Sequence, residues 1–385
     1  MAGHSTSPLT DFMFYKADNS NIPLNGTFEV TPQCNFSCRM CYVRKTAAEV
    51  RDSKRPMMTL DQWLQLAKEA CDAGMLYLLL TGGEPTIWPD FWKLYEELIQ
   101  MGLLISINTN GSRLNDQAME TLVKFPPRRV NVTLYGAENS TYEKLCGVEN
   151  MFTVVDHAVR QLQSAGIQVK LNCSLTPFNV CDLEKMIAYA KEQKLILDIA
   201  SYMFPPIRRD GSMIGRNDRF TPEESAFYRL KAYRLQYGET QYKSFLKKIR
   251  EGSIPSPGLE EGCIDPVDGK IRCRAGKSSF WVTWDGWISP CGMMAEPQVE
   301  SRDRSFSAAW NELTEISRNI MLSGVCSTCS NLQLCHSCAA MAQTETGTFS
   351  GIPVYLCETV NEMKRLAEET LCEDDTISKT KQFFA

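Results

Sequence analysis

Three cysteines, Cys34, Cys38 and Cys41, lie within eight residues of the chain. They follow a short apolar segment, Phe28 to Val30, which predicts a strand ending just before them. Thiolates this close together can wrap one iron–sulfur cubane from a single loop, and three of them leave one iron open to another ligand. A zinc loop or unrelated core thiols are the alternatives, but zinc sites usually take four ligands. The spacing therefore favours an iron–sulfur loop with one open iron.

This C-x3-C-x2-C spacing resembles the cluster loop of radical S-adenosylmethionine (SAM) enzymes. In that family the open iron chelates the methionine end of SAM, and one electron from the cluster cleaves SAM to a 5′-deoxyadenosyl radical. The resemblance implies that Cys34, Cys38 and Cys41 are the catalytic cluster ligands. Met40 stands where relatives often have an aromatic residue and can still pack on the adenine. Tyr42, directly after the third cysteine, is a further expected cofactor contact.

A second motif, Gly82-Gly83-Glu84, follows the apolar run Met75 to Leu80 and resembles the Gly-Gly-Glu loop of the same family. Glycines let backbone carbonyls approach a ligand closely, and a carboxylate suits the ammonium group of methionine. The alternative is a tight turn between a strand and a helix. The Gly-Gly-Glu motif lies about forty residues after the cysteine loop, and this position favours a SAM contact.

The resemblance also implies that the hydroxyls of Thr109 and Thr133 contact the ribose of SAM, and that Lys144 is a weaker candidate for its carboxylate. The alternatives are ordinary strand threonines and an exposed helix lysine. Trp88 departs from the family, because relatives often have a basic residue there.

Eight further cysteines in the last third of the chain resemble the SPASM extension of radical SAM enzymes, which holds two auxiliary [4Fe–4S] clusters. The carried-over ligation assigns the first auxiliary cluster to Cys263, Cys273, Cys291 and Cys338. It assigns the second to Cys326, Cys329, Cys335 and Cys357. The interval before Cys338 has two residues where the family usually has three. A zinc ribbon is the alternative, but its cysteine pairs normally stand a dozen or more residues apart, and five residues intervene here.

Strands and helices alternate between residues 28 and 200, which predicts βαβ units and a parallel sheet. Six units are too few for a closed eight-stranded barrel. We therefore expect an α/β fold in which a partial (β/α)6 TIM-type barrel precedes a smaller cysteine-rich iron–sulfur domain. Active residues of parallel barrels lie at the carboxyl ends of the strands, so the cysteine loop, the Gly-Gly-Glu loop and the Thr109-Asn110-Gly111 turn should share one rim. The expected domains are a polar tail (1–25), the barrel (26–220), a helical linker (221–262), the auxiliary cluster domain (263–372) and a C-terminal tail (373–385).

The composition indicates the cellular compartment of the protein and excludes some classes of binding partner. The chain has 385 residues and a formal net charge of −5, which gives no electrostatic footprint for nucleic acid or an anionic membrane. Nothing resembles a signal peptide or a membrane span. We therefore expect a cytoplasmic protein, in which 16 cysteines indicate metal binding rather than disulfides. Cys71, Cys146, Cys173, Cys181 and Cys372 fit neither pattern and are expected to be packing thiols.

The extension occurs mostly on enzymes that modify peptides or proteins, so the expected reaction is oxidative maturation of a ribosomal peptide through a thioether or carbon–carbon crosslink. Only 33 residues precede Cys34, too few for the leader-recognition domain that many such maturases have at the amino terminus, so we expect either a separate leader-binding protein or a small substrate. We also expect a flavodoxin- or ferredoxin-type reductant. Oxidation or epimerisation of a small molecule such as a sugar, and a non-enzymatic electron-transfer protein, are the alternatives. Formylglycine formation in sulfatases is disfavoured. In the sulfatase-maturating enzymes an Asp that serves as the base follows the corresponding cysteine, whereas here Gly292 follows Cys291.

The last strand is followed by an aromatic and basic segment that could contact a peptide. It contains Tyr202, Arg208, Arg209, Arg216 and Arg219. A solvated basic loop is the alternative.

Overall fold

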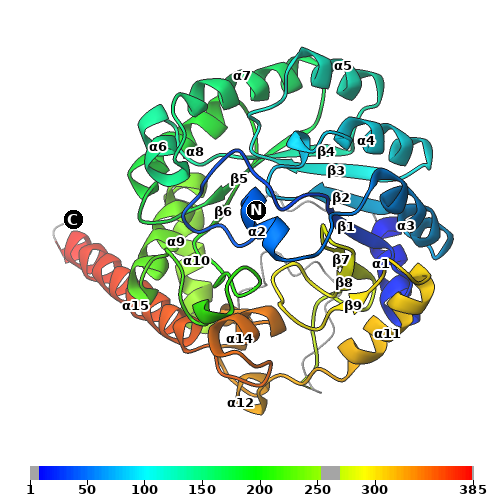
Figure 1. Ribbon diagram of the computed structural model, residues 1–385. Helices are drawn as coiled ribbons and strands as arrows, with labels where there is room; N and C mark the ends of the chain where they lie inside the picture. Colours follow the sequence, from blue (N-terminus) through cyan, green and yellow to red (C-terminus); the bar gives the residue numbers. More distant parts are fainter. Residues whose placement is uncertain (1–7, 253–268, 384–385) are drawn as a thin grey trace.

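The computed structural model describes residues 8–252 and 269–383, with side chains described as far as residue 373. Its centre is a parallel sheet with the spatial order β6-β5-β4-β3-β2-β1. The six strands are β1 (Asn25–Glu29), β2 (Tyr77–Thr81), β3 (Leu104–Thr109), β4 (Arg129–Thr133), β5 (Val169–Ser174) and β6 (Leu197–Ala200). Figure 1 shows this sheet curving inside a ring of helices. The partial barrel expected from the sequence is confirmed.

One outer helix lies between most successive strands, and two lie between β4 and β5. They are α3 (Leu60–Asp72), α4 (Phe91–Gln100), α5 (Asp116–Lys124), α6 (Asn139–Cys146), α7 (Met151–Ser164) and α8 (Leu183–Glu192). Each buries an apolar stripe against the sheet, as Trp63 of α3 does beside Phe28 of β1, with ring centroids 4.9 Å apart. The capping box predicted at Thr59 and Gln62 begins α3. Short 3-10 turns at Pro85–Ile87 (η1), Val180–Asp182 (η2) and Gly211–Met213 (η3) complete this part.

The sheet does not end at β1. Strand β7 (Ser279–Val282) pairs with β1 in parallel, and β8 (Trp287–Ser289) and β9 (Val299–Glu300) add antiparallel strands beyond it. The cysteine-rich part of the chain is therefore joined to the barrel through main-chain hydrogen bonds, and the sheet has nine strands among the described residues. This pairing was not expected from the sequence, because the short strands alternate too briefly to indicate their partner.

The C-terminal region is helical. It contains α11 (Phe306–Arg318), α12 (Gly324–Ser327), α13 (Leu332–Cys335), α14 (Ala339–Thr346) and α15 (Val354–Phe383). Helices α9 (Pro222–Tyr237) and α10 (Glu239–Glu251) share a hydrophobic core with α15, in which Leu230, Leu246 and Met363 are buried. The segment expected to be a linker thus packs as part of a helical layer, and α15 continues where a C-terminal tail was expected (Figure 1).

Two segments expected to lack structure contain helices. Residues 8–20 of the expected polar tail form α1 (Pro8–Ser20), because Phe14 and Ala17 on one face are buried together with Leu24. The charged segment after the cysteine loop contains α2 (Ala47–Asp52), which begins with a capping box at Thr46. Among the described helices, none is long and apolar enough to cross a membrane.

Candidate active site

The loop between β1 and α2 holds Cys34, Cys38 and Cys41 at the carboxyl end of the barrel. Backbone amides point at two of its sulfurs: the Phe36 N–H donates to Cys34 Sγ (3.3 Å) and the Arg44 N–H to Cys41 Sγ (3.3 Å). Such donors stabilise thiolates and therefore suit metal-ligating cysteines. Among the described residues, however, no group of three or more His, Cys, Asp or Glu side chains is arranged to hold a single metal ion.

This loop is fixed to the end of α6. The Ser37 and Arg39 amides donate to the carbonyls of Cys146 (2.8 Å) and Leu145 (3.2 Å). The thiol of Cys146 and the hydroxyl of Tyr135 form hydrogen bonds with Cys38, and these lower the pKa of the Cys38 thiol against the opposing effect of burial. Cys146, expected to be a packing thiol, is fully buried and directly contacts a predicted cluster ligand.

Burial has the opposite effect on the other two thiols. It raises the pKa of Cys34 to about 12 and also raises the pKa of Cys41, with a further rise from the neighbouring thiols. Without metal these thiols are protonated at neutral pH, so cluster assembly must release protons.

The glycines of the second motif allow two loops to touch. A Cβ atom on Gly83 would lie 2.2 Å from the carbonyl oxygen of Gln33, and one on Gly82 would lie 2.4 Å from that of Thr31. The Gly83 and Glu84 amides donate to these same two carbonyls, Thr31 (2.7 Å) and Gln33 (2.9 Å). The loop after β2 is therefore bound to the segment that leads into the cysteine loop, and side chains would separate them.

Glu84 is fully buried and its carboxylate accepts hydrogen bonds from the chain itself. Its donors are the Thr86 amide (3.2 Å) and hydroxyl (2.6 Å), the Thr109 hydroxyl (2.8 Å) and the Asn110 amide (2.6 Å). Burial raises the pKa of the Glu84 carboxyl, and these hydrogen bonds oppose the rise. The carboxylate thus ties the end of β2 to the end of β3.

The loop after β3 reaches the cysteines through Asn110, which was not among the expected site residues. Its side-chain amide donates to Cys34 Sγ (3.8 Å) and to Asn35 Oδ1 (3.0 Å). The signal was present, because Asn110 lies in the Thr-Asn-Gly turn expected on the rim. The loops after β1, β2 and β3 therefore share one rim, as expected for a parallel barrel.

The other predicted cofactor contacts lie around this rim. Met40 is buried and Tyr42 half-buried beside the third cysteine, and Thr133 is half-buried at the end of β4. Lys144 is exposed on α6. Contact of these side chains with SAM stays a prediction.

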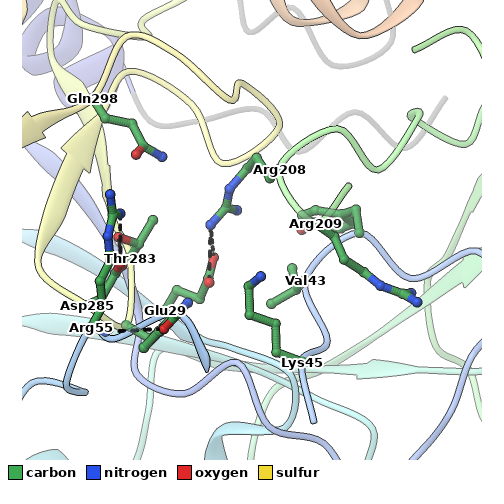
Figure 2. A pocket seen from close by; sticks show the side chains of 12 residues that line it. Glu29, Val43, Lys45, Arg55, Arg208, Arg209, Thr283, Asp285 and Gln298 are labelled. Atoms are coloured by element: carbon green, nitrogen blue, oxygen red, sulfur yellow. Dashed lines mark hydrogen bonds and ion pairs between the residues drawn. The ribbon is translucent and has the colours of Figure 1, made fainter. Parts of the chain in front are cut away.

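A cavity of about 170 Å³ lies next to this loop, between Tyr42, the end of β1 and the turn after β7 (Figure 2). Its buried wall is an ion pair in which the Arg208 guanidinium contacts both oxygens of Glu29, at 2.9 and 3.2 Å. Arg208 also donates to the Gly292 carbonyl (2.7 Å), and the Trp281 indole donates to Glu29 (2.9 Å). Burial raises the pKa of the Glu29 carboxyl, and these two donors oppose the rise.

The basic segment after β6 is only partly solvated. Arg219 is buried in an ion pair with Glu345 of α14 (2.5 Å), and the Tyr202 hydroxyl donates to the same carboxylate (2.6 Å). Arg209 and Arg216 are exposed. A solvated basic loop thus describes Arg209 and Arg216 but not Arg208 or Arg219.

The later cysteines fall into two groups. Cys273, Cys291 and Cys338 pack into one small hydrophobic core, and their thiols raise each other's pKa in addition to the larger effect of burial. In the second group, burial and the neighbouring thiols of Cys357 and Cys326 raise the pKa of Cys335 to about 11. Cys357 in turn lies near Cys326 and Cys329, whose charges raise its pKa in addition to burial. Cys263 lies outside the described residues.

Buried cationic groups without partners accompany these thiols. The Nε and Nη2 atoms of Arg272 are buried with no hydrogen-bond partner among the described residues, and the guanidinium lies near Cys326, Cys335 and Cys338. Buried Nε of Arg44, beside the first cysteine loop, is likewise without a partner in the described chain. Unpaired buried cations next to several thiols fit anionic thiolate-held clusters, which would compensate their charge.

Comparison with known proteins decides the family of the barrel. A family model described as the Radical SAM superfamily matches residues 28–190, which run from β1 through α8. The chain contains a radical SAM domain. This match supports SAM binding and one [4Fe–4S] cluster, and the assignment of Cys34, Cys38 and Cys41 to that cluster stays a prediction.

Two relatives and a solved structure extend the radical SAM comparison. An AdoMet-dependent heme synthase of Methanosarcina barkeri is 24% identical over 345 residues, which are 86% of this chain and 95% of that protein. A probable GTP 3′,8-cyclase of Sulfurisphaera tokodaii is 30% identical over 165 residues, 42% of this chain and 50% of that protein. A structure of native anSMEcpe with bound AdoMet and the Cp18Cys peptide has a TM-score of 0.66 and 17% identity, over 91% of this chain and 98% of that chain. The structural likeness shows a shared fold beyond the radical SAM domain.

Proposed function

We propose that this chain is a radical SAM enzyme that oxidatively modifies a peptide through a thioether or carbon–carbon crosslink. The observation that carries the proposal is the connection between its two cysteine-rich parts. Arg208 binds Glu29, at the end of the strand before the cysteine loop, and the carbonyl of Gly292, directly after Cys291. A substrate in the cavity beside Arg208 would therefore lie between the radical-generating loop and the cysteine group of the second part.

Different residues at the rim would bind the cluster, the methionine end of SAM and its nucleoside. Cys34, Cys38 and Cys41 would hold a [4Fe–4S] cluster, and Gly82, Gly83 and Glu84 would bind the methionine end. Met40, Tyr42, Thr109 and Thr133 would contact the nucleoside. The reduced cluster would supply the electron that cleaves bound SAM, and this cleavage would give the 5′-deoxyadenosyl radical needed to remove a hydrogen atom from the substrate.

Oxidation of the substrate requires the loss of a second electron. Cys273, Cys291 and Cys338, together with Cys263, would hold one auxiliary [4Fe–4S] cluster, and Cys326, Cys329, Cys335 and Cys357 would hold another. An auxiliary cluster beside the cavity is suited to accept that electron. A flavodoxin- or ferredoxin-type protein would supply the reducing electron for SAM cleavage, and we place the enzyme in the cytoplasm.

Two observations support a peptide substrate. The fold is shared with anSMEcpe, which binds the Cp18Cys peptide. The cavity is lined by charged and polar side chains that suit a polar chain segment. A separate leader-binding protein would present the peptide.

Formylglycine formation is not proposed. A side chain at position 292 would collide with the Trp281 ring, because a Cβ there would lie 2.5 Å from ring carbons. An Asp that could serve as the base of this reaction therefore has no room at position 292.

Oxidation of a small molecule is the second candidate, and one observation favours it. The match to the heme synthase covers nearly all of that protein. That relative points to a small substrate rather than a peptide.

Mass spectrometry of the substrate distinguishes these candidates. Reconstituted enzyme with SAM and reductant should lower the mass of a peptide from its own gene neighbourhood by about two daltons, the two hydrogens lost in forming one crosslink. An aldehyde trap should leave that product unchanged. Turnover of a small molecule with no change in any such peptide would favour the second candidate.

A further inference from the structure

The charges around the cavity beside Tyr42 are unequal. Four cationic side chains line it, Lys45, Arg55, Arg208 and Arg209, whereas its carboxylates are Glu29 and Asp285. Each carboxylate already has a cation: Arg208 pairs with Glu29 at 2.9 Å, and Arg55 pairs with Asp285 at 3.1 Å. Two cations are left over, so the cavity carries net positive charge.

Lys45 is the more enclosed of these two cations. It is half-buried, and within the part of the chain that the structure describes it makes no ion pair. In Figure 2 its ammonium group extends toward the Arg208–Glu29 pair, and the Gln298 amide points into the cavity from the opposite side. Both groups present hydrogen-bond donors to the same space.

Arg209 lies at the edge of the cavity. Its guanidinium is exposed, turns outward in Figure 2 and lies 3.4 Å from the Cys41 carbonyl oxygen. Glu49 of α2 interacts electrostatically with Arg209 and Lys45, but it is exposed and accepts the Thr46 amide of its own capping box. It does not line the cavity, so it offers no carboxylate oxygen to this space.

We infer that this cavity binds a carboxylate carried by the substrate, with Lys45 as the main cation and Gln298 as a second donor. The inference rests on the proposed function and names the chemical class that the substrate must present. The Lys45 ammonium has no carboxylate partner in the described chain, so an incoming carboxylate would balance its charge and form a charge-assisted hydrogen bond with it. Because Tyr42 follows Cys41 directly, a carboxylate held here would anchor a substrate next to the radical-generating loop.

A carboxylate could come from an acidic residue of a peptide or from a small molecule. Equilibrium dialysis of the reconstituted full chain, with SAM and without reductant, measures both sources without turnover. The probes are acetyl-Gly-Glu-Gly-amide, its Gln counterpart, glutarate and inorganic phosphate. The Glu peptide should bind about tenfold more tightly than the Gln peptide, as a desolvated charge-assisted hydrogen bond allows. Glutarate binding more tightly than the Glu peptide would assign the site to a small carboxylate, and the reverse order to a peptide.

Variants identify the site. Lys45→Met should abolish the preference for Glu over Gln, whereas Lys45→Arg, which keeps the charge, should retain it. Lys68→Met, at an exposed lysine on α3, is the matched control and should also retain the preference.

Three results would overturn the inference. These are equal binding of the Glu and Gln peptides together with no binding of glutarate; an unchanged preference for the carboxylate probe in Lys45→Met; and phosphate binding more tightly than both carboxylates. Formation of 5′-deoxyadenosine is assayed separately with reductant. If wild-type protein forms no 5′-deoxyadenosine, the proposed function is contradicted. If wild-type protein cleaves SAM but binds no carboxylate probe in the dialysis, only the carboxylate site is contradicted.

Discussion

Arg208 and Glu29 connect the segment after β6 to the end of β1, five strands away in the sheet. Glu29 is the last residue of β1, and Arg208 lies eight residues beyond the end of β6. The guanidinium contacts both carboxylate oxygens, and the two side chains are 10% and 1% exposed. This buried pair therefore ties two distant parts of the barrel together beside the predicted active site.

Replacing Arg208 by Met should destabilise the protein by about 3–5 kcal/mol, because the Glu29 charge would be left buried without its cation. Burial already raises the pKa of Glu29, and loss of Arg208 would raise it further. A native carboxyl with a raised pKa binds protons more readily than the unfolded chain, so stability is gained as the pH falls through that pKa. The deficit should therefore be largest at neutral pH and shrink toward the ordinary glutamate value of 4.5.

Denaturant unfolding at several pH values measures this effect. The double variant Glu29→Gln with Arg208→Met is the control and should recover part of the loss, since no unpaired charge remains. A deficit of the same size at every pH would contradict an ionised pair.

Glu84→Ala should lower stability by about 2–4 kcal/mol even without SAM, because the Thr109 hydroxyl and the Asn110 amide would lose their buried acceptor. The same variant should bind SAM more weakly, since the loop that holds the methionine end would be displaced. Thermal unfolding of the SAM-free protein and calorimetric SAM titration separate the two effects. Unchanged SAM affinity would remove Glu84 from the SAM site.

Asn110→Ala should lower the reduction potential of the SAM-binding cluster, because the Cys34 sulfur would lose a hydrogen-bond donor. A redox titration followed by electron paramagnetic resonance measures it, using the signal that changes when SAM is added. Asn139→Ala, at a position on α6 whose amide contacts Thr153, is the control and should not shift the potential. An equal potential in Asn110→Ala and wild type would contradict the contact.

Gly292→Asp tests why this chain lacks the sulfatase-type base. The new side chain should push against Trp281 and cost about 1–3 kcal/mol of stability. Neither wild type nor variant should form an aldehyde in a Cys-x-Pro-x-Arg sulfatase peptide, as read by mass spectrometry with an aldehyde trap. A trapped aldehyde from wild type would contradict the assignment to crosslinking.

The barrel was predictable because its signals are local. Apolar runs of strand length alternate with amphipathic helices, and the apolar run Met75 to Leu80 lies within two residues of the observed bounds of β2. Pairing of β7 with β1 was not predictable, since a four-residue strand carries no mark of its partner. Helix α1 was missed because only Phe14 and Ala17 within it are buried, and its sequence is otherwise polar.

In the candidate site, too, features set by local sequence were predictable and contacts between distant residues were not. Spacing along the chain identified the cysteine loop and the Gly-Gly-Glu loop as candidates. Other contacts join residues that are 25 to 179 positions apart. They are the bonds of Glu84 to Thr109 and Asn110, the contact between Cys146 and Cys38, and the Arg208–Glu29 pair. Such contacts arise from the fold, and residue type alone does not indicate them.

The central claim is tested most directly by SAM cleavage. Anaerobically reconstituted wild-type protein with a strong reductant should convert SAM to methionine and 5′-deoxyadenosine, measured by liquid chromatography with mass spectrometry. The variant with Cys34, Cys38 and Cys41 all replaced by Ala should form no 5′-deoxyadenosine and should bind about four fewer irons than wild type, the content of one cubane. Cleavage of SAM by the triple variant at the wild-type rate, or no cleavage by iron-loaded wild type, would contradict the account.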